Sequence, residues 1–262
     1  MIRSNELLKE LWQYRELLYF LAWRDIKVRY KQASLGAAWA IIQPLFSMII
    51  FTLFFGKLAG VPSDGIPYPL FAYCALVPWT YFSGVLSQGG QSLVGNSNLI
   101  TKVYFPRMIL PASTAVSGLL DFAVGSTFLI VLMAYYRVAP NWSLLLAPVF
   151  LVNLFLLTAG VSMLTAALNV RYRDVKYALP FLIQLGLFVT PVIYPMTLIP
   201  KQFQWIAALN PLSGIVDGFR ACVFGRALDP ALLGVSLGVT LLIFITGALY
   251  FRETERAFAD II

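Results

Sequence analysis

Six long segments that are almost free of charged side chains constrain this chain of 262 residues more than any other feature. They are Gln32–Gly56, Gly65–Thr101, Met108–Tyr136, Val138–Val170, Tyr177–Pro200 and Pro230–Phe251, and they contain one charged residue, Asp121. About 20 apolar residues rising 1.5 Å each cross a ~30 Å hydrocarbon core, so each segment can hold one membrane-spanning helix. A chain that is 60% hydrophobic, with a mean hydropathy of +0.79, lies outside the range of soluble domains. The sequence therefore predicts an all-α integral membrane protein with six transmembrane helices.

Gly, Pro and polar residues at the edges of these segments set the expected helix ends. The first span begins after Gly36 and contains Pro44, a kink site that is tolerated where neighbouring helices satisfy the freed carbonyl. The other five spans are expected at Leu70–Ser87, Pro111–Tyr136, Leu144–Asn169, Ala178–Ile199 and Leu232–Tyr250.

The distribution of Lys and Arg predicts the orientation in the membrane. If both termini are cytoplasmic, 14 of the 19 basic residues fall in the cytoplasmic segments 1–36, 93–107, 171–176 and 252–262. The outer side then holds Lys57, Arg137, Lys201, Arg220 and Arg226. An excess of Lys and Arg in cytoplasmic segments is the usual determinant of topology, so we expect both termini in the cytoplasm. This asymmetry, together with anionic lipid at the inner leaflet, accounts for the net charge of +7 without a nucleic-acid partner.

The N-terminal segment is predicted to be an amphipathic helix rather than a cleaved signal peptide. Charged residues of both signs continue through Glu16, where a signal peptide would have its apolar core. The apolar residues that recur every three or four positions, and so form one stripe of a helix, are Leu7, Leu11, Tyr14, Leu18 and Leu21. We expect a helix of about 20 residues lying in the inner interface.

The chain lacks the side chains that most membrane enzymes and ion-coupled carriers use. It has no His, which excludes His-ligated metals, Ser-His-Asp triads and His proton relays. It also has no G-x-x-x-x-G-K-[ST] motif to cradle ATP. Asp121 is the single acid deep in a predicted span, and no internal repeat is visible, in contrast to coupled carriers. We expect no catalytic site, metal or cofactor on this chain, and Cys74 and Cys222 as buried free thiols.

The segment 201–226 differs from the spans that flank it. Asn210 and Pro211 suit the N-cap and the first position of a helix, so two short helices are expected, one before and one after this pair. At 1.5 Å per residue they reach only ~12 and ~20 Å, too short to cross separately. A single seventh span is the alternative, and it would place Arg252 and Arg256 outside. We therefore predict a broken re-entrant helix pair on the outer face, between spans five and six.

Several short motifs occur in the same order as in one known family. The segment Asp25–Lys31, with Leu35, Gly36 and Trp39, resembles the approach to the first span in permeases of bacterial polysaccharide exporters, which are ATP-binding-cassette exporters of the second type. The segment Asn98–Lys102, with Phe105, Pro106, Arg107 and Pro111, resembles the loop between their second and third spans. Later matches are Arg171–Asp174, Thr190, Pro191, Tyr194, Asn210–Leu212 and Phe258–Asp260. The resemblance covers the whole chain and is closer to O-antigen and teichoic-acid permeases than to capsule permeases.

The resemblance implies one transmembrane permease domain over residues 1–262, with an N-terminal region (1–31), a membrane bundle (32–251) and a cytoplasmic tail (252–262). It implies a homodimer in the bacterial inner membrane, with two copies of a cytoplasmic ATPase that bind ATP and Mg. The expected cargo is an undecaprenyl-diphosphate-linked polysaccharide such as O-antigen. One alternative is a permease of the same type that exports a drug, a lipid or another polymer. The other is a membrane-embedded enzyme, for which no catalytic constellation is visible.

The loop Gly95–Arg107 is the expected ATPase-coupling helix, as the resemblance implies. Its candidate residues are Asn96, Asn98, Leu99, Ile100, Lys102, Phe105 and Arg107. Asn96 or Ser97 suits a helix cap, the apolar residues would supply the contact, and Lys102 and Arg107 could pair with acids on the ATPase. The alternative is an ordinary basic loop that sets topology. Arg171–Lys176 is a second candidate contact, with the same alternative.

A cluster of basic residues precedes the first span and is the candidate site for a lipid diphosphate at the inner gate. It consists of Arg24, Lys27, Arg29 and Lys31. Clustered Arg and Lys suit a diphosphate through charge-assisted contacts, and they equally suit generic anionic lipid or topology. Positions 27, 29 and 31 cannot share one helical face, which argues against a single pocket that contains all four.

Two sets of residues are candidates for lining a glycan passage, on spans one and five, which the resemblance suggests form it. They are Trp39, Gln43 and Phe46 on the first span and Phe181, Gln184 and Phe188 on the fifth. Aromatic rings pack on the C–H faces of sugars, although such stripes also form lipid contacts or core. Phe244 and Phe251 on the last span are expected to face lipid. Asp121 is expected to face the bundle or a wet cavity, because a charge in hydrocarbon is costly.

Overall fold

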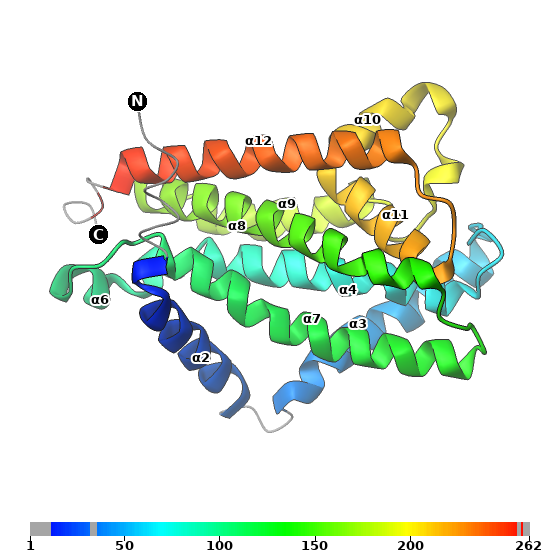
Figure 1. Ribbon diagram of the computed structural model, residues 1–262, viewed down its shortest axis with the longest axis horizontal. Coiled ribbons are helices and arrows are strands. Elements are labelled where there is room, and N and C mark those ends of the chain that lie inside the picture. Colours follow the sequence, from blue (N-terminus) through cyan, green and yellow to red (C-terminus); the bar gives the residue numbers. More distant parts are fainter. Residues whose placement is uncertain (1–11, 32–35, 256–257, 259–262) are drawn as a thin grey trace.

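A computed structural model describes residues 12–31, 36–255 and 258, and within these ranges the chain is built of helices without strands (Figure 1). The main helices are α2 (Arg15–Lys31), α3 (Trp39–Phe51), α4 (Tyr68–Gly89), α7 (Ile109–Tyr135), α8 (Ala147–Arg171), α9 (Val175–Val189), α11 (Pro211–Phe224) and α12 (Pro230–Glu255). The short helices are α5 (Ser92–Gly95), α6 (Ser97–Lys102) and α10 (Gln204–Leu209), and a π-helical segment, Thr52–Leu58, extends α3. The all-α prediction is confirmed.

Five helices in the described part of the chain are long and apolar enough to cross a membrane. They are Trp39–Leu58, Tyr68–Gly89, Ile109–Tyr135, Trp142–Arg171 and Pro230–Glu255, and they correspond to five of the six predicted spans. The predicted fifth span, Ala178–Ile199, is instead the 15-residue helix α9, which ends at Val189. The ring of Pro191 disfavours the helical conformation at the residue before it, and Thr190 is extended with ψ 140°. α9 alone is ~22 Å long, so its length does not establish a sixth span.

α4 is the central helix of the bundle. It packs against α3, α7, α8 and α11, and 78% of its most apolar stretch is buried, compared with 17% for the first span. Two of its tyrosines are buried and donate hydrogen bonds to backbone carbonyls of α7, Tyr73 to Gly125 and Tyr81 to Ala115, the second at 3.0 Å. These bonds give the buried hydroxyls partners in an apolar core, where an unpaired polar group is costly. α4 is thus the element on which the other helices are positioned.

α12 packs along α8 at a close helix–helix contact. A Cβ at Gly160 of α8 would lie 2.6 Å from the Cα of Phe244, so glycine is needed at this crossing. Phe251 is fully buried, and Phe244 is partly buried against the main core. The prediction that these two aromatic residues face lipid is therefore wrong. Both belong to the side of α12 that packs against the protein.

α2 lies obliquely across one end of the bundle and packs against α7 (Figure 1). Of the predicted apolar stripe, Leu7 and Leu11 lie outside the described residues. Leu21 is buried, and Tyr14 and Leu18 pack against the same core cluster. The helix runs to Lys31, ten residues beyond the predicted stripe, and carries exposed aromatic rings on its other side, among them Phe20 and Trp23.

α10 and α11 lie at the opposite end of the bundle from α6 (Figure 1). The side chain of Asn210 accepts a hydrogen bond from the backbone N–H of Leu212 at 3.1 Å, and Pro211 is the first residue of α11. Gly225 ends α11 with a φ of +67°, in the left-handed region that favours glycine. The two predicted short helices and their boundary are confirmed, as are the free, buried thiols of Cys74 and Cys222.

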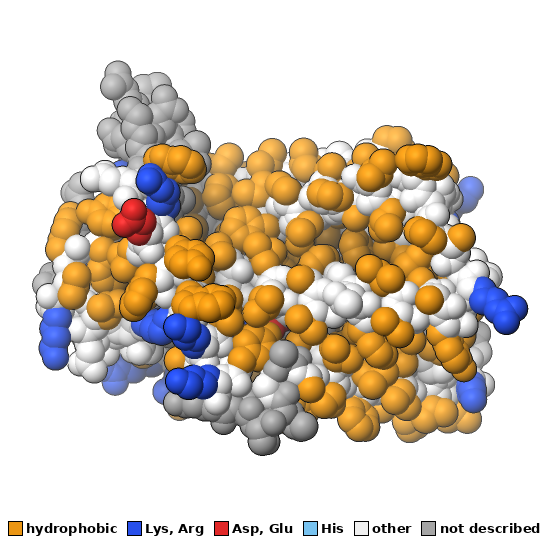
Figure 2. Space-filling model, turned by 60° about the horizontal axis from the view of Figure 1, so that its bottom comes forward, with side chains coloured by type: hydrophobic (Ala, Val, Ile, Leu, Met, Phe, Trp, Pro, Cys, Tyr) orange, Lys and Arg blue, Asp and Glu red, His pale blue; other side chains and the backbone are white. Residues whose placement is uncertain are grey.

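Figure 2 shows how charge is distributed over one face of the molecule. Hydrophobic side chains cover its middle, and Lys and Arg gather mainly at the left, the end from which α2 begins and at which α12 ends, with a few at the opposite end. A broad apolar girdle between two polar ends is the surface expected of a bundle that crosses a membrane.

Candidate functional site

The carboxylate of Asp121, in the middle of α7, is bound by two residues of α2. Arg29 forms an ion pair with one carboxylate oxygen, and the hydroxyl of Tyr30 donates to the other. The second terminal nitrogen of Arg29 donates to the side-chain carbonyl of Gln88, on α4. Burial and the hydrogen bond to Asp121 raise the pKa of Tyr30 above its ordinary value, so its hydroxyl stays a donor. Asp121 does face the bundle, and its partner, which the sequence did not reveal, is on the oblique helix.

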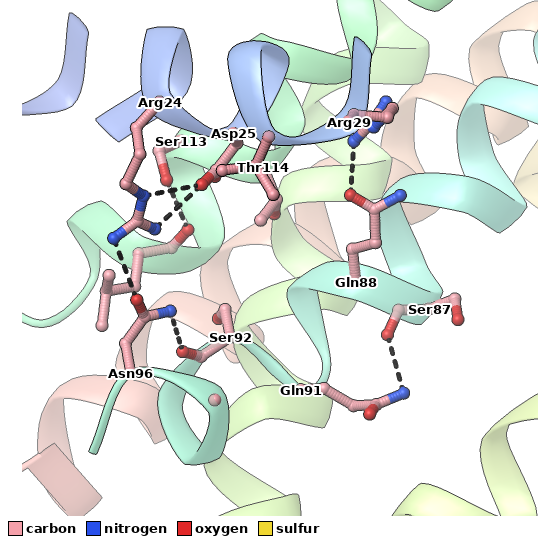
Figure 3. A pocket seen from close by; sticks show the side chains of 13 residues that line it. Arg24, Asp25, Arg29, Ser87, Gln88, Gln91, Ser92, Asn96, Ser113 and Thr114 are labelled. Atoms are coloured by element: carbon pink, nitrogen blue, oxygen red, sulfur yellow. Dashed lines mark hydrogen bonds and ion pairs between the residues drawn. The ribbon is translucent and has the colours of Figure 1, made fainter. Parts of the chain in front are cut away.

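A second contact ties α2 to the segment between α5 and α6. The guanidinium of Arg24 donates to Asp25 at 2.8 Å and to the side-chain carbonyl of Asn96 at 3.0 Å (Figure 3). The amide nitrogen of Asn96 in turn donates to the backbone carbonyl of Ser92 at 2.8 Å. Asn96 precedes α6 but makes no capping hydrogen bond. Asn96, one of the two predicted cap residues, thus occupies the N-cap position of α6, but its side chain contacts α2 instead of capping the helix.

Two cavities open beside these contacts. The larger, of about 560 Å³, is lined by α2, α4, α5 and α7, including Arg24 and Arg29 from α2 (Figure 3). Its other polar lining residues are Asp25, Ser87, Gln88, Gln91, Ser92, Asn96, Ser113 and Thr114. The smaller, of about 180 Å³, contains Asp121, Tyr30, Trp39 and Gln43. Arg29 and Gln88 line both cavities and so lie between them.

The predicted basic cluster divides between two environments. Arg24 and Arg29 line the larger cavity, whereas Lys27 lies with its ammonium 5.6 Å from the centre of the Trp23 ring. Lys31 is exposed at the end of α2. The structure therefore brings two of the four predicted basic residues together in one cavity, as the helical spacing required.

The predicted coupling segment contains buried residues as well as exposed ones. Ile100 and Phe105 are each 5% exposed and belong to the core cluster beneath α6, with Leu99 packed against its edge. The backbone N–H of Arg107 donates to the carboxylate of Glu255 at 2.6 Å, and its guanidinium donates to the backbone carbonyl of the same residue. Ile100 and Phe105 are thus internal packing residues, and the expectation that they form an external apolar contact is wrong.

The exposed part of this segment is formed by different residues. Tyr104 is 95% exposed and Val103 is 52% exposed, directly after α6. Lys102 and Asn98 are exposed beside them. The sequence analysis did not include Tyr104 among the candidate residues. Its position was a usable signal, because it lies between Lys102 and Pro106, in the segment whose apolar side chains were expected to contact the ATPase.

The turn between α8 and α9 lies at the same end of the bundle as α6 (Figure 1). Arg171, Tyr172, Arg173 and Lys176 are exposed there, so the second predicted contact is accessible. Arg171 and Lys176 lie over the rings of Tyr172 and Tyr177, at 5.4 and 4.7 Å from the ring centres.

The six predicted passage residues are all exposed in the single chain: Trp39, Gln43, Phe46, Phe181, Gln184 and Phe188. Their helices, α3 and α9, both pack against α4. Trp39 and Gln43 line the smaller cavity, whereas the α9 residues line neither of the two cavities described above. The structure thus leaves both aromatic faces uncovered.

Arg220 of α11 is a buried cation, which the sequence analysis counted only as a basic residue on the outer side of the membrane. It is 2% exposed, donates to the backbone carbonyls of Pro191 and Val192 at 2.5 and 2.6 Å, and lies 3.6 Å from the centre of the Phe71 ring. It therefore holds the segment that follows α9. The one signal in the sequence was a basic residue within an otherwise apolar stretch, three positions after Asp217.

Comparison with known proteins gives a match over most of the chain. The family model described as ABC-2 type transporter matches residues 16–224. An O-antigen export system permease protein, RfbA, of Myxococcus xanthus is 31% identical over 253 residues, covering 95% of this chain and 96% of the relative. A protein of the same name from Klebsiella pneumoniae is 27% identical over 94% of this chain and 95% of its own length. The polysialic acid transport protein KpsM of Escherichia coli is 24% identical over 89% of this chain and 92% of its own.

Proposed function

The chain belongs to the ABC-2 type transporter family, and from this premise we propose that it is the membrane-spanning subunit of an exporter that moves lipid-linked O-antigen polysaccharide outward. The observation that carries the proposal is the similarity to O-antigen export permeases over nearly the whole length of both chains. Five long apolar helices support a multi-pass subunit. The missing phosphate-binding motif supports a division of labour in which a partner ATPase hydrolyses ATP.

The proposed location is the bacterial inner membrane, with both termini in the cytoplasm. α2, α6 and the α8–α9 turn lie at one end of the bundle, which carries most of the Lys and Arg. An excess of basic residues favours the cytoplasmic side. α10 and α11 then lie at the outer side, as a re-entrant pair that does not cross. α2 lies at the inner interface, where its exposed aromatic rings would meet the headgroup region.

We further propose a homodimer that binds two copies of an ATP-binding-cassette ATPase, which carry ATP and Mg. The docking surface consists of the exposed residues Asn98, Lys102, Val103 and Tyr104, with a smaller contribution from the α8–α9 turn. Tyr is among the residues that are enriched at protein–protein interfaces and at their energetic hot spots. Because Ile100 and Phe105 pack beneath this surface, a force on it would reach α2 and α12 through the core cluster that they share.

The larger cavity is the proposed site for the diphosphate of the lipid carrier. Arg24 and Arg29 supply two guanidinium groups, whose planar donor sets suit phosphate oxygens. The hydroxyl of Ser87 and the amide of Gln91 supply further polar contacts. At about 560 Å³ the cavity has room for a headgroup.

The proposed function is tested by deleting the gene in its host. We expect surface O-antigen to be lost, lipid-linked polymer to accumulate inside the cell, and a plasmid copy to restore export. The purified chain alone should hydrolyse no ATP above background. Normal surface polymer in the deletion strain, together with a new sensitivity to a small hydrophobic compound, would favour the alternative of a drug or lipid exporter.

The exposed aromatic faces of α3 and α9 are the proposed lining of the polysaccharide passage. Cysteine at Phe46 or Phe188 should react faster with a water-soluble thiol reagent when the complex binds ATP than at rest, because the passage admits water when it opens. Cysteine at Leu242 or Ile245, exposed on α12, serves as the lipid-facing control and should react slowly in both states. Equal labelling at Phe46 and Leu242 in both states would contradict the lining role.

A further inference from the structure

The two arginines that line the larger cavity also form polar contacts between α2 and other parts of the protein. Arg24 reaches Asn96, at the junction of α5 and α6, and Arg29 reaches Gln88 on α4 (Figure 3). Arg29 also forms the ion pair with Asp121 on α7. Both guanidinium groups are thus already engaged with protein acceptors. An anion that enters the cavity has to compete with these acceptors for the same donors.

The contacts around Arg29 have the properties needed for such a competition. The side chains of Arg29 and Asp121 are 25% and 23% exposed, so neither is sealed inside the bundle. Arg29 also lies between the two cavities, with Asp121 on one side and the headgroup cavity on the other. A change of rotamer is enough to move a long, flexible Arg side chain from one partner to the other.

Losing Arg29 would change the position that α2 prefers. Asp121 would keep the hydroxyl of Tyr30 but would lose the cation that compensates its charge in an apolar surrounding. A carboxylate without its counter-charge favours a conformation that admits water, and here that means separation of α2 from α7. If Arg24 turns to the same anion, Asn96 loses its link to α2, and this releases the segment next to the docking surface.

We propose that this cavity is a substrate sensor that works by exchange of partners. When a diphosphate headgroup binds, Arg29 leaves Asp121 and Arg24 leaves Asn96, and both arginines contact the phosphates instead. The contacts of α2 with α7 and with the docking segment are thereby broken. The inference rests on the proposed headgroup site and adds the regulation of that site. By linkage, an event at the docking surface that breaks these contacts also raises the affinity of the cavity for the headgroup. The factor by which it raises this affinity equals the factor by which headgroup binding favours that event. The ATPase would thereby respond to loaded transporter.

The exchange of partners predicts an unexpected effect of replacing Asp121. Because its carboxylate is a competitor for Arg29, Asp121→Asn should strengthen binding of a prenyl diphosphate, although it removes a native contact. Arg29→Gln should weaken binding about tenfold, since a charge-assisted contact is lost. Arg15→Gln is the matched control: it makes the same change on α2, at an exposed arginine outside the cavity, and should leave binding unchanged.

The movement is measured on the full chain with its ATPase in nanodiscs, with spin labels on cysteines at Phe20 of α2 and Ile130 of α7, which are both exposed. The native Cys74 and Cys222 are replaced by Ala. Farnesyl diphosphate should shift the main distance peak in the wild type. Asp121→Asn lacks the ion pair between α2 and α7 but leaves no unpaired carboxylate, so its peak without ligand should lie between those of the free and the bound wild type. Inorganic pyrophosphate tests whether the diphosphate suffices without its lipid tail. A shift with either compound supports the exchange.

The outcomes of these experiments distinguish the exchange of partners from binding at the headgroup site, on which it depends. Binding of farnesyl diphosphate without a change in the distance would overturn the exchange and leave the site standing. Absence of binding would remove the site and the exchange together. If Asp121→Asn does not fold, the double variant Arg29→Gln with Asp121→Asn removes both charges, and its distance peak should not respond to ligand. A response equal to that of the wild type would overturn the proposal.

Discussion

Replacing Tyr104 with Asp is expected to abolish co-purification of the ATPase and to reduce surface polysaccharide to the level of a deletion strain. The ring is 95% exposed at the tip of the segment that follows α6, so it contributes nothing to the core of the single chain. An aromatic anchor at an interface is typically worth about 2 kcal/mol or more, which corresponds to roughly 30-fold in affinity. A carboxylate at the same place adds the cost of burying a charge.

The comparison variants separate docking from folding. Tyr104→Phe keeps the ring and should retain most of the co-purification. Tyr135→Asp places the same charge at another exposed tyrosine, at the opposite end of the bundle, and should leave the ATPase bound. Membrane insertion and expression of all three variants are measured in parallel. If Tyr104→Asp retains the ATPase as well as Tyr104→Phe does, the docking surface lies elsewhere.

Arg220→Met is expected to cause the largest loss of stability in the half of the molecule that contains α10 and α11. The substitution leaves the backbone carbonyls of Pro191 and Val192 without their donor and removes the cation from the ring of Phe71. Two unsatisfied buried acceptors cost roughly 1–3 kcal/mol each. For a chain of this size, a loss of about 3 kcal/mol lowers the thermal midpoint by roughly 10 °C.

Arg226 supplies the matched control for this prediction. It lies just after α11 and pairs with Asp64 at 2.7 Å, but both side chains are partly exposed, at 31% and 23%. Such pairs contribute about 0–1 kcal/mol, so Arg226→Gln should lower the midpoint by only a few degrees. Arg220→Lys should not restore the wild-type value, since an ammonium lacks the planar donor set that reaches two carbonyls. Thermal unfolding in detergent measures all three, and equal shifts for Arg220→Met and Arg226→Gln would contradict the structural role.

The sequence predicted the features that depend on composition and on neighbours along the chain. The five long apolar helices follow from uncharged segments of about 20 residues, because the cost of placing residues in lipid is summed along one segment. The boundary between α10 and α11 follows from Asn210 and Pro211, whose effect on the backbone is local. A local signal also explains why the predicted fifth span was too long. Pro191 ends α9 at Val189, although the apolar stretch continues beyond this residue.

The direction in which each side chain faces was decided by the tertiary structure. In water a helix shows its buried side by an apolar stripe, but in a membrane bundle the lipid-facing and protein-facing sides are both apolar. For this reason Phe251 was predicted from the sequence to face lipid and proved buried. Polar partners distant in the chain were equally invisible: Arg29 and Asp121 are separated by 92 residues, and only the packing of α2 against α7 brings them into contact. The sequence by itself determined that this chain enters a membrane as a set of helices, whereas the tertiary structure decided which charges meet between them.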